Sequence, residues 1–233
     1  MAILLTFLLL APGPAAEKVP QLETLLKARK TNDALALLKK IGELKENHVE
    51  AKALVKLIRK PKPKMPPEII EASFHALAGI ESREITKSLL MLMKVRRLKK
   101  DHVARIGICL VLEATGDPAG IEYLTDRMVD VDDRVTAAAA AAMGTHRHAK
   151  ESVRKELFTA LLKIFVPTYN LTKSLKGDHK SQRRRAERKW ELIEKPFEKS
   201  LQLLSNHTER TPPQWQRWWN KNKHKRWTAR QEE

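Results

Sequence analysis

The chain has 233 residues, of which 45 are Lys or Arg and 28 are Asp or Glu, so its formal net charge is +17. A single cysteine excludes an internal disulfide framework and a cysteine-based zinc site. Eight glycines and 5% aromatic residues argue against a β-sandwich, a β-propeller and a glycine-rich nucleotide-binding fold. Because 31% of the residues are charged and Ala, Leu and Lys are abundant, we expect an all-α protein.

The first 16 residues have the pattern of a secretory signal peptide. An apolar run over residues 3–11 is followed by helix breakers and small residues over residues 12–16. The run is too short to cross a bilayer, which takes about 20 residues. No Lys or Arg precedes it, so an apolar helix packed into the fold is the alternative interpretation. We expect residues 1–16 to be a signal peptide and the mature protein to be exported, periplasmic or extracellular.

Three amphipathic helices are expected before the first proline-rich segment. Apolar residues recur at helical spacing over residues 22–26, 34–41 and 49–58. Several prolines between residues 61 and 67 end the third helix, because proline lacks an amide donor and clashes with the preceding turn.

From residue 70 onward the sequence repeats itself at intervals of 32 or 33 residues. Similar helices open at Ile70, Val103 and Val135. Later positions of these helices and of their partner helices recur in step. The aligned sets are Ala76, Cys109 and Ala141, at 33 and 32 residues, and then Leu89, Leu124 and Leu157 of the partner helices, at 35 and 33 residues. A two-helix unit of this length cannot bury its apolar face alone, so neighbouring units must stack, which predicts an α-solenoid.

The repeated units resemble a known family of helical repeats. Residues 101–130, with the sequence DHVARIGICLVLEATGDPAGIEYLTDRMVD, look like a HEAT-like repeat of the short bacterial type. Residues 132–165 resemble a second such repeat, and residues 67–99 resemble a more divergent one. The resemblance implies the same stacked-helix fold that the periodicity predicts.

Two positions depart from the family pattern. Gly107 lies inside a helix, and Ala137 stands where the preceding unit has Arg105. The resemblance implies that residues 17–166 form a HEAT-like repeat domain that serves as a binding scaffold, and it specifies no ligand.

The composition changes after Phe165, and we expect Val166 and Pro167 to end a helix. Residues 167–181 are expected to be a linker, and residues 182–233 a basic, tryptophan-rich helical segment. Residues 171–233 contain 17 Lys or Arg and 8 Asp or Glu. This charge either attracts a polyanion or an anionic membrane surface, or belongs to a solvated helix face. The candidate polyanion-binding residues are Arg183, Arg184, Arg185, Arg188, Lys189, Lys225, Arg226 and Trp227.

Tryptophans in this segment suggest a cap on the open end of the solenoid. Trp190 begins an apolar helix face, and Trp215, Trp218 and Trp219 share one side of a later helix. These four are candidate cap residues, because the last unit of a solenoid must be covered. The alternative is a recognition surface for nucleic acid or glycans, built on stacking and cation–π contacts. Trp227 lies in a basic stretch and is expected to be the exposed aromatic residue.

No motif predicts catalysis. The sequence has no glycine-rich phosphate loop, no nucleophile elbow and no His-Glu-x-x-His helix. His146 and His148 are expected in a solvated turn, and Cys109 at a buried repeat position. Three acidic residues are expected to serve a helix N-terminus rather than a cation, namely Asp130, Asp132 and Asp133. We therefore expect no catalytic, cofactor-binding or metal-binding residues.

These observations favour a non-enzymatic, exported scaffold that binds another protein on the concave helix face of its repeats. The alternative is a polyanion-binding module that uses the basic C-terminal segment to hold nucleic acid, an anionic envelope polymer or lipid. Export argues against nucleic acid as the partner. A glycosylase-like HEAT enzyme is the third and least favoured hypothesis, because no catalytic acid can be assigned.

Overall fold

The computed structural model describes residues 18–45, 47–59, 65–173 and 180–227. Every regular element in these ranges is a helix, which confirms the expected all-α class. The expected signal peptide and the first prolines of the proline-rich segment lie outside the described residues. The α-helices are α1 (Lys18–Lys27), α2 (Thr31–Gly42), α3 (His48–Arg59), α4 (Pro67–Ile80), α5 (Thr86–Leu90), α6 (Arg96–Lys100), α7 (His102–Thr115), α8 (Ile121–Arg127), α9 (Asp133–Gly144), α10 (Glu151–Lys173), α11 (Lys180–Ser205) and α12 (Pro212–Asn222).

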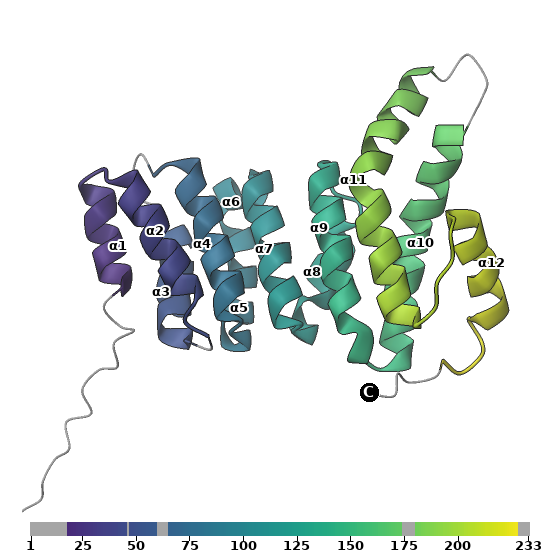
Figure 1. Cartoon of the computed structure of the whole chain (residues 1–233), viewed down its shortest axis with the longest axis horizontal. Coiled ribbons are helices and arrows are strands. Elements are labelled where there is room, and N and C mark those ends of the chain that lie inside the picture. The colour runs from purple at the N-terminus through teal and green to yellow at the C-terminus, as the bar shows by residue number, and fades with distance from the viewer. Residues whose placement is uncertain (1–17, 46, 60–64, 174–179, 228–233) are drawn as a thin grey trace, which may run out of the picture.

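A row of packed helices follows the long axis of the molecule between α1 and α12 (Figure 1). In this row, α2 packs on α4, α4 on α7, α7 on α9, and α9 on α11. The helices between them in sequence lie beside the row, with α3 against α4, α6 against α7, α8 against α9, and α10 against α11. The buried apolar side chains of both sets join in one continuous core.

Buried positions recur along the row, but in a different register from the one that the sequence predicted. Equivalent core residues of α4, α7 and α9 lie 35 and then 31 positions apart, not 33 and 32. The equivalent sets are Ile69, Ala104 and Val135; Phe74, Cys109 and Ala140; and Leu77, Leu112 and Met143. The intervals differ because a longer segment, containing α5 and α6, separates α4 from α7, whereas only a short 3-10 turn and α8 separate α7 from α9.

Two glycines let neighbouring helices of the row approach closely. A Cβ atom on Gly79 of α4 would overlap the backbone of Gly42 in α2. A Cβ atom on Gly107 of α7 would overlap the ring of Phe74 in α4. Gly107 therefore has a packing role inside its helix, which explains this departure from the repeat pattern.

Helices α10 and α11 form a hairpin whose far end extends past the ends of the neighbouring helices (Figure 1). At the two ends of the expected linker the chain is helical instead, since α10 continues through Pro167 to Lys173 and α11 begins at Lys180. The middle of that segment, residues 174–179, lies outside the described residues. Aromatic contacts hold the two helices together on both sides of this proline. The Phe165 ring lies 4.9 Å from that of Trp190, and Tyr169 lies 5.4 Å from the same indole. This packing offsets the roughly 3 kcal/mol that an interior proline costs a helix.

Helix α12 packs on α10 through an aromatic cluster centred on Phe158. The Phe158 ring centroid lies 5.3–5.8 Å from those of four indoles, belonging to Trp215, Trp218, Trp219 and Trp227. Trp215 is fully buried, as expected of a cap residue, whereas Trp218, Trp219 and Trp190 are half-buried. The expected exposure of Trp227 is wrong. Its side chain is 6% exposed, because the chain after α12 folds back over α10 and its indole N–H donates to the Asn222 carbonyl.

Candidate binding surfaces

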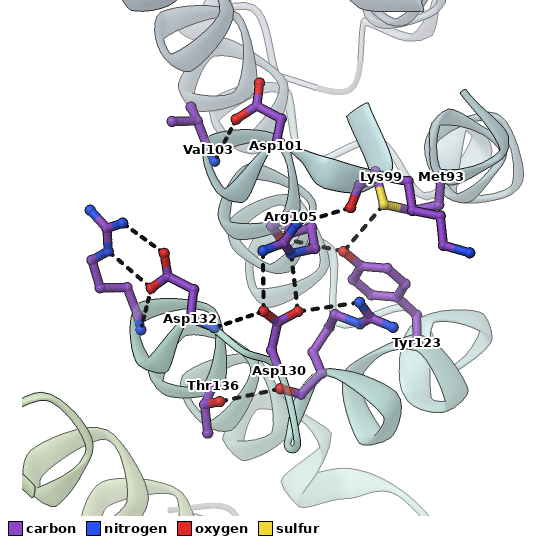
Figure 2. A network of polar contacts seen from close by, with 11 residues as sticks. Met93, Lys99, Asp101, Val103, Arg105, Tyr123, Asp130, Asp132 and Thr136 are labelled. Carbon is purple, nitrogen blue, oxygen red and sulfur yellow. Dashed lines mark hydrogen bonds and ion pairs between the residues drawn. The ribbon is translucent and has the colours of Figure 1, made fainter. Parts of the chain in front are cut away.

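A buried ion-pair network joins α7, the end of α8 and the turn that leads into α9 (Figure 2). The Arg105 Nε atom of α7 lies 3.0 Å from Asp130 Oδ2, and the two side chains are 7% and 3% exposed. Asp130 also pairs with Arg127 at the end of α8 and accepts a hydrogen bond from the backbone N–H of Asp132. The Arg105 guanidinium donates in addition to the carbonyl of Lys99. The network fixes the orientation of α7 relative to α8 and α9.

The three acidic residues at the start of α9, Asp130, Asp132 and Asp133, all have ion-pair or hydrogen-bond partners. Asp132 accepts from the backbone N–H of Arg134 as the N-cap of α9, and Asp133 pairs with Lys189 of α11 at 2.9 Å. The Arg134 guanidinium lowers the pKa of the Asp132 carboxyl. Asp132 thus serves the helix N-terminus, as expected, whereas Asp130 serves Arg105 instead. Among the described residues, no group of three or more His, Cys, Asp or Glu could hold a metal ion.

A groove lies across the faces of α4, α7 and α9, with a volume of about 440 Å³. Its apolar lining includes Val103, Ile106 and Leu110 of α7 and Ala138 of α9, all of them half-buried. Polar side chains surround this apolar strip, namely Glu71, His75, His102, Glu113 and Arg134. We call this surface the row groove.

The row groove exists because α7 has a second apolar face. Val103, Ile106 and Leu110 follow a spacing of three and four residues, beside the buried set that packs on α4 and α9. Burial raises the pKa of Glu113, and the charge of Lys199 on α11 partly offsets this effect. The sequence predicted a binding face on the helices but identified none of these residues, although their spacing was visible in it.

Comparisons with protein-family models, curated proteins and solved structures found no match to this chain. The resemblance to HEAT-like repeats therefore stays a prediction that rests on the sequence. No helix in the described ranges combines the length and apolarity that crossing a membrane requires.

The candidate polyanion-binding residues do not form one cluster. Arg184, Arg185 and Arg188 are exposed on α11 and contact no other described side chain by hydrogen bond or ion pair. Arg183 forms an ion pair with Glu187 within the helix, and Lys189 forms the ion pair with Asp133 described above. The other three candidates follow α12, at the opposite end of the α10–α11 hairpin (Figure 1); they are Lys225, Arg226 and Trp227.

Two groups with possible chemical reactivity are both buried. Cys109 is fully buried, as the repeat pattern predicted, and burial raises the pKa of its thiol to about 12. It therefore carries almost no thiolate at neutral pH. His146 was expected in a solvated turn, but it is 3% exposed and occupies a core position just after α9. Burial lowers the pKa of its imidazole.

Proposed function

We propose that this chain is a non-enzymatic, exported interaction scaffold, an α-solenoid of HEAT-like repeats that binds a partner protein along the row groove. One observation carries the proposal: the half-buried apolar strip of Val103, Ile106 and Leu110 keeps part of its surface open to the groove, which no other described part of the chain fills. An apolar strip with a polar border is the arrangement found in protein–protein interfaces.

The surrounding structure supports a preformed binding surface. The groove is built on helices rather than on loops, and the Arg105–Asp130 pair and the Phe74–Gly107 contact hold those helices in place. A rigid surface loses little conformational entropy on binding, which favours affinity. Stacked helical repeats use such extended faces to bind other proteins.

Variants of the groove test this proposal by affinity capture from an envelope extract. Leu110→Glu places a charge on the apolar strip, and Glu71→Lys changes an exposed border residue without touching the core. Leu192→Glu, at an exposed apolar residue of α11, is the matched control. We expect a protein held by the wild type and by the control to be lost from both groove variants, with equal thermal stability of Glu71→Lys and wild type. Equal capture by all four chains would contradict the proposal.

The second candidate function is binding of an anionic polymer or membrane surface. The observation that favours it is the group of exposed arginines on α11, Arg184, Arg185 and Arg188. Each phosphate that such a group neutralises releases a counterion, so affinity falls steeply with salt. Titration of polyphosphate and of phosphatidylglycerol vesicles at several salt concentrations tests it. A steep salt dependence that disappears when all three arginines become Gln would establish this function, and weak, salt-independent binding would exclude it.

A further inference from the structure

A second apolar depression lies between α8, α10 and α12 and shares no residue with the row groove. Its volume is about 630 Å³ and it is open to solvent along one side. The floor is one face of α10, where Thr159 and Ala160 are small and half-buried. We call this surface the α10 trough.

The walls of the α10 trough come from two other elements. On one side stands Trp219 of α12, which is fixed by stacking on Phe158 with a centroid distance of 5.3 Å. On the other side Met128 and Val129 follow the end of α8. Val129 is 76% exposed, and Val131, two residues further along, is 91% exposed. Val129 is therefore an apolar side chain left in water at the edge of an apolar depression, an arrangement typical of an interaction site.

Positive charge borders the trough. Lys163 of α10 and Lys223 after α12 line it, and neither side chain forms a hydrogen bond or an ion pair with another described residue. Lys155 also lines it but is engaged, since it pairs with Glu151 and donates to the carbonyl of Lys225. Glu156 is the only acidic residue in the lining. The border thus complements a negatively charged partner.

We propose that the α10 trough binds an acidic amphipathic helix of a partner protein. The floor extends from Lys155 to Ile164, about 14 Å of helix, which matches two to three turns of a docked helix. Such a helix inserts apolar side chains at positions i, i+3, i+4 and i+7 and leaves its flanks beside the groove border. Acidic flanks would then lie next to Lys163 and Lys223. An open trough fits a chain segment better than a small molecule, which is usually enclosed on most sides.

A displayed library of 18-residue helical peptides tests this proposal with the full chain. Leu is fixed at i, i+3, i+4 and i+7, and the flanking positions vary among Asp, Glu, Lys, Arg and Gln. We expect the selected peptides to be enriched in Asp and Glu over Lys and Arg, and to bind at least 10-fold more weakly when Lys163 and Lys223 both become Glu. The matched control changes Lys195 and Lys199 of α11 to Glu, both exposed and outside the trough, and should alter affinity less than 2-fold.

A second variant separates blocking of the trough from charge effects. Ala160→Arg fills the floor while keeping the border positive, and we expect it to abolish binding of the selected peptides. Circular dichroism melts of each variant establish that the fold is retained. Selection of peptides without an acidic bias, or binding that survives Ala160→Arg, would overturn the proposal. Retention on anionic vesicles with no peptide selected would overturn it too, since the trough would then serve a membrane surface.

Discussion

The guanidinium of Arg105 and the carboxylate of Asp130 form a buried ion pair between residues that are 25 positions apart, with Nε and Oδ2 separated by 3.0 Å. Arg105 belongs to α7, and Asp130 belongs to the turn that leads into α9. The pair therefore ties α7 to the turn that leads into α9. The pair also helps to set the shape of the row groove, because α7 and α9 both line that groove.

We expect Asp130→Asn to lower the free energy of unfolding by about 3–5 kcal/mol, because it leaves the buried Arg105 cation without its partner. Glu81→Gln is the control, since it removes an exposed ion pair with Lys45 and should change stability by less than about 1 kcal/mol. Urea denaturation measures both. Similar small losses in the two variants would show that the buried pair contributes little.

For Gly107→Ala, the sign of the change in the free energy of unfolding tests the packing of α7 on α4. Replacing an interior helical glycine by alanine ordinarily stabilises a helix by roughly 1 kcal/mol. Here the new Cβ would overlap the Phe74 ring, so we expect a loss of about 1–3 kcal/mol instead. The double variant with Phe74→Leu should recover part of this loss. Thermal unfolding decides the matter, and a gain in stability for Gly107→Ala would contradict the close approach of α4 and α7.

The buried His146 makes stability depend on pH. Its pKa is lowered in the fold by burial, an effect that the charge of Asp117 partly opposes, so the unfolded chain binds more protons near the ordinary value of 6.5. The contribution of His146 to the free energy of unfolding is therefore fully present above pH 6.5 and is lost as the pH falls below that value. We expect the wild type to lose more stability between pH 7.5 and pH 6 than His146→Gln does. The exposed His224→Gln variant should behave as the wild type, and identical slopes for all three would refute the burial of His146.

Trp227 is expected to hold the segment that follows α12 against α10. Trp227→Ala removes a buried indole that contacts Phe158 and lies 5.6 Å from the Arg154 guanidinium. We expect trypsin to cleave after Lys221 and Lys223 many times faster in this variant, because α12 loses its cover. His224→Ala, at an exposed neighbouring residue, should leave the rate unchanged. Rapid cleavage already in the wild type would mean that α12 does not dock.

The sequence predicted the all-α class correctly, because apolar residues at helical spacing are the ones that the helices bury in the core. The structure adds that Asp101 is the N-cap of α7, where the carboxylate accepts a hydrogen bond from the Val103 N–H. The register of the repeat was wrong because apolar residues of α7 lie on two faces. Val103 lines a groove, whereas its neighbour Ala104 is in the core.

Long-range contacts account for what the sequence could not show. Pro167 is a helix breaker by local rules, and only the aromatic packing of α10 against α11 keeps the helix continuous past it. Trp227 is flanked by cations in sequence, yet Phe158 and Arg154 of α10 bury it. Neither trough nor row groove could be located from the sequence, since each combines residues of three separate helices.

Hydrogen exchange of the full chain, with and without a purified captured partner, tests the proposed function most directly. We expect slower amide exchange on partner binding in the helices that line the row groove, α4, α7 and α9, with little change over α1 and α2. Slowing confined to the first half of α11, beside Arg184, Arg185 and Arg188, would contradict a protein-binding groove and favour the polyanion function instead.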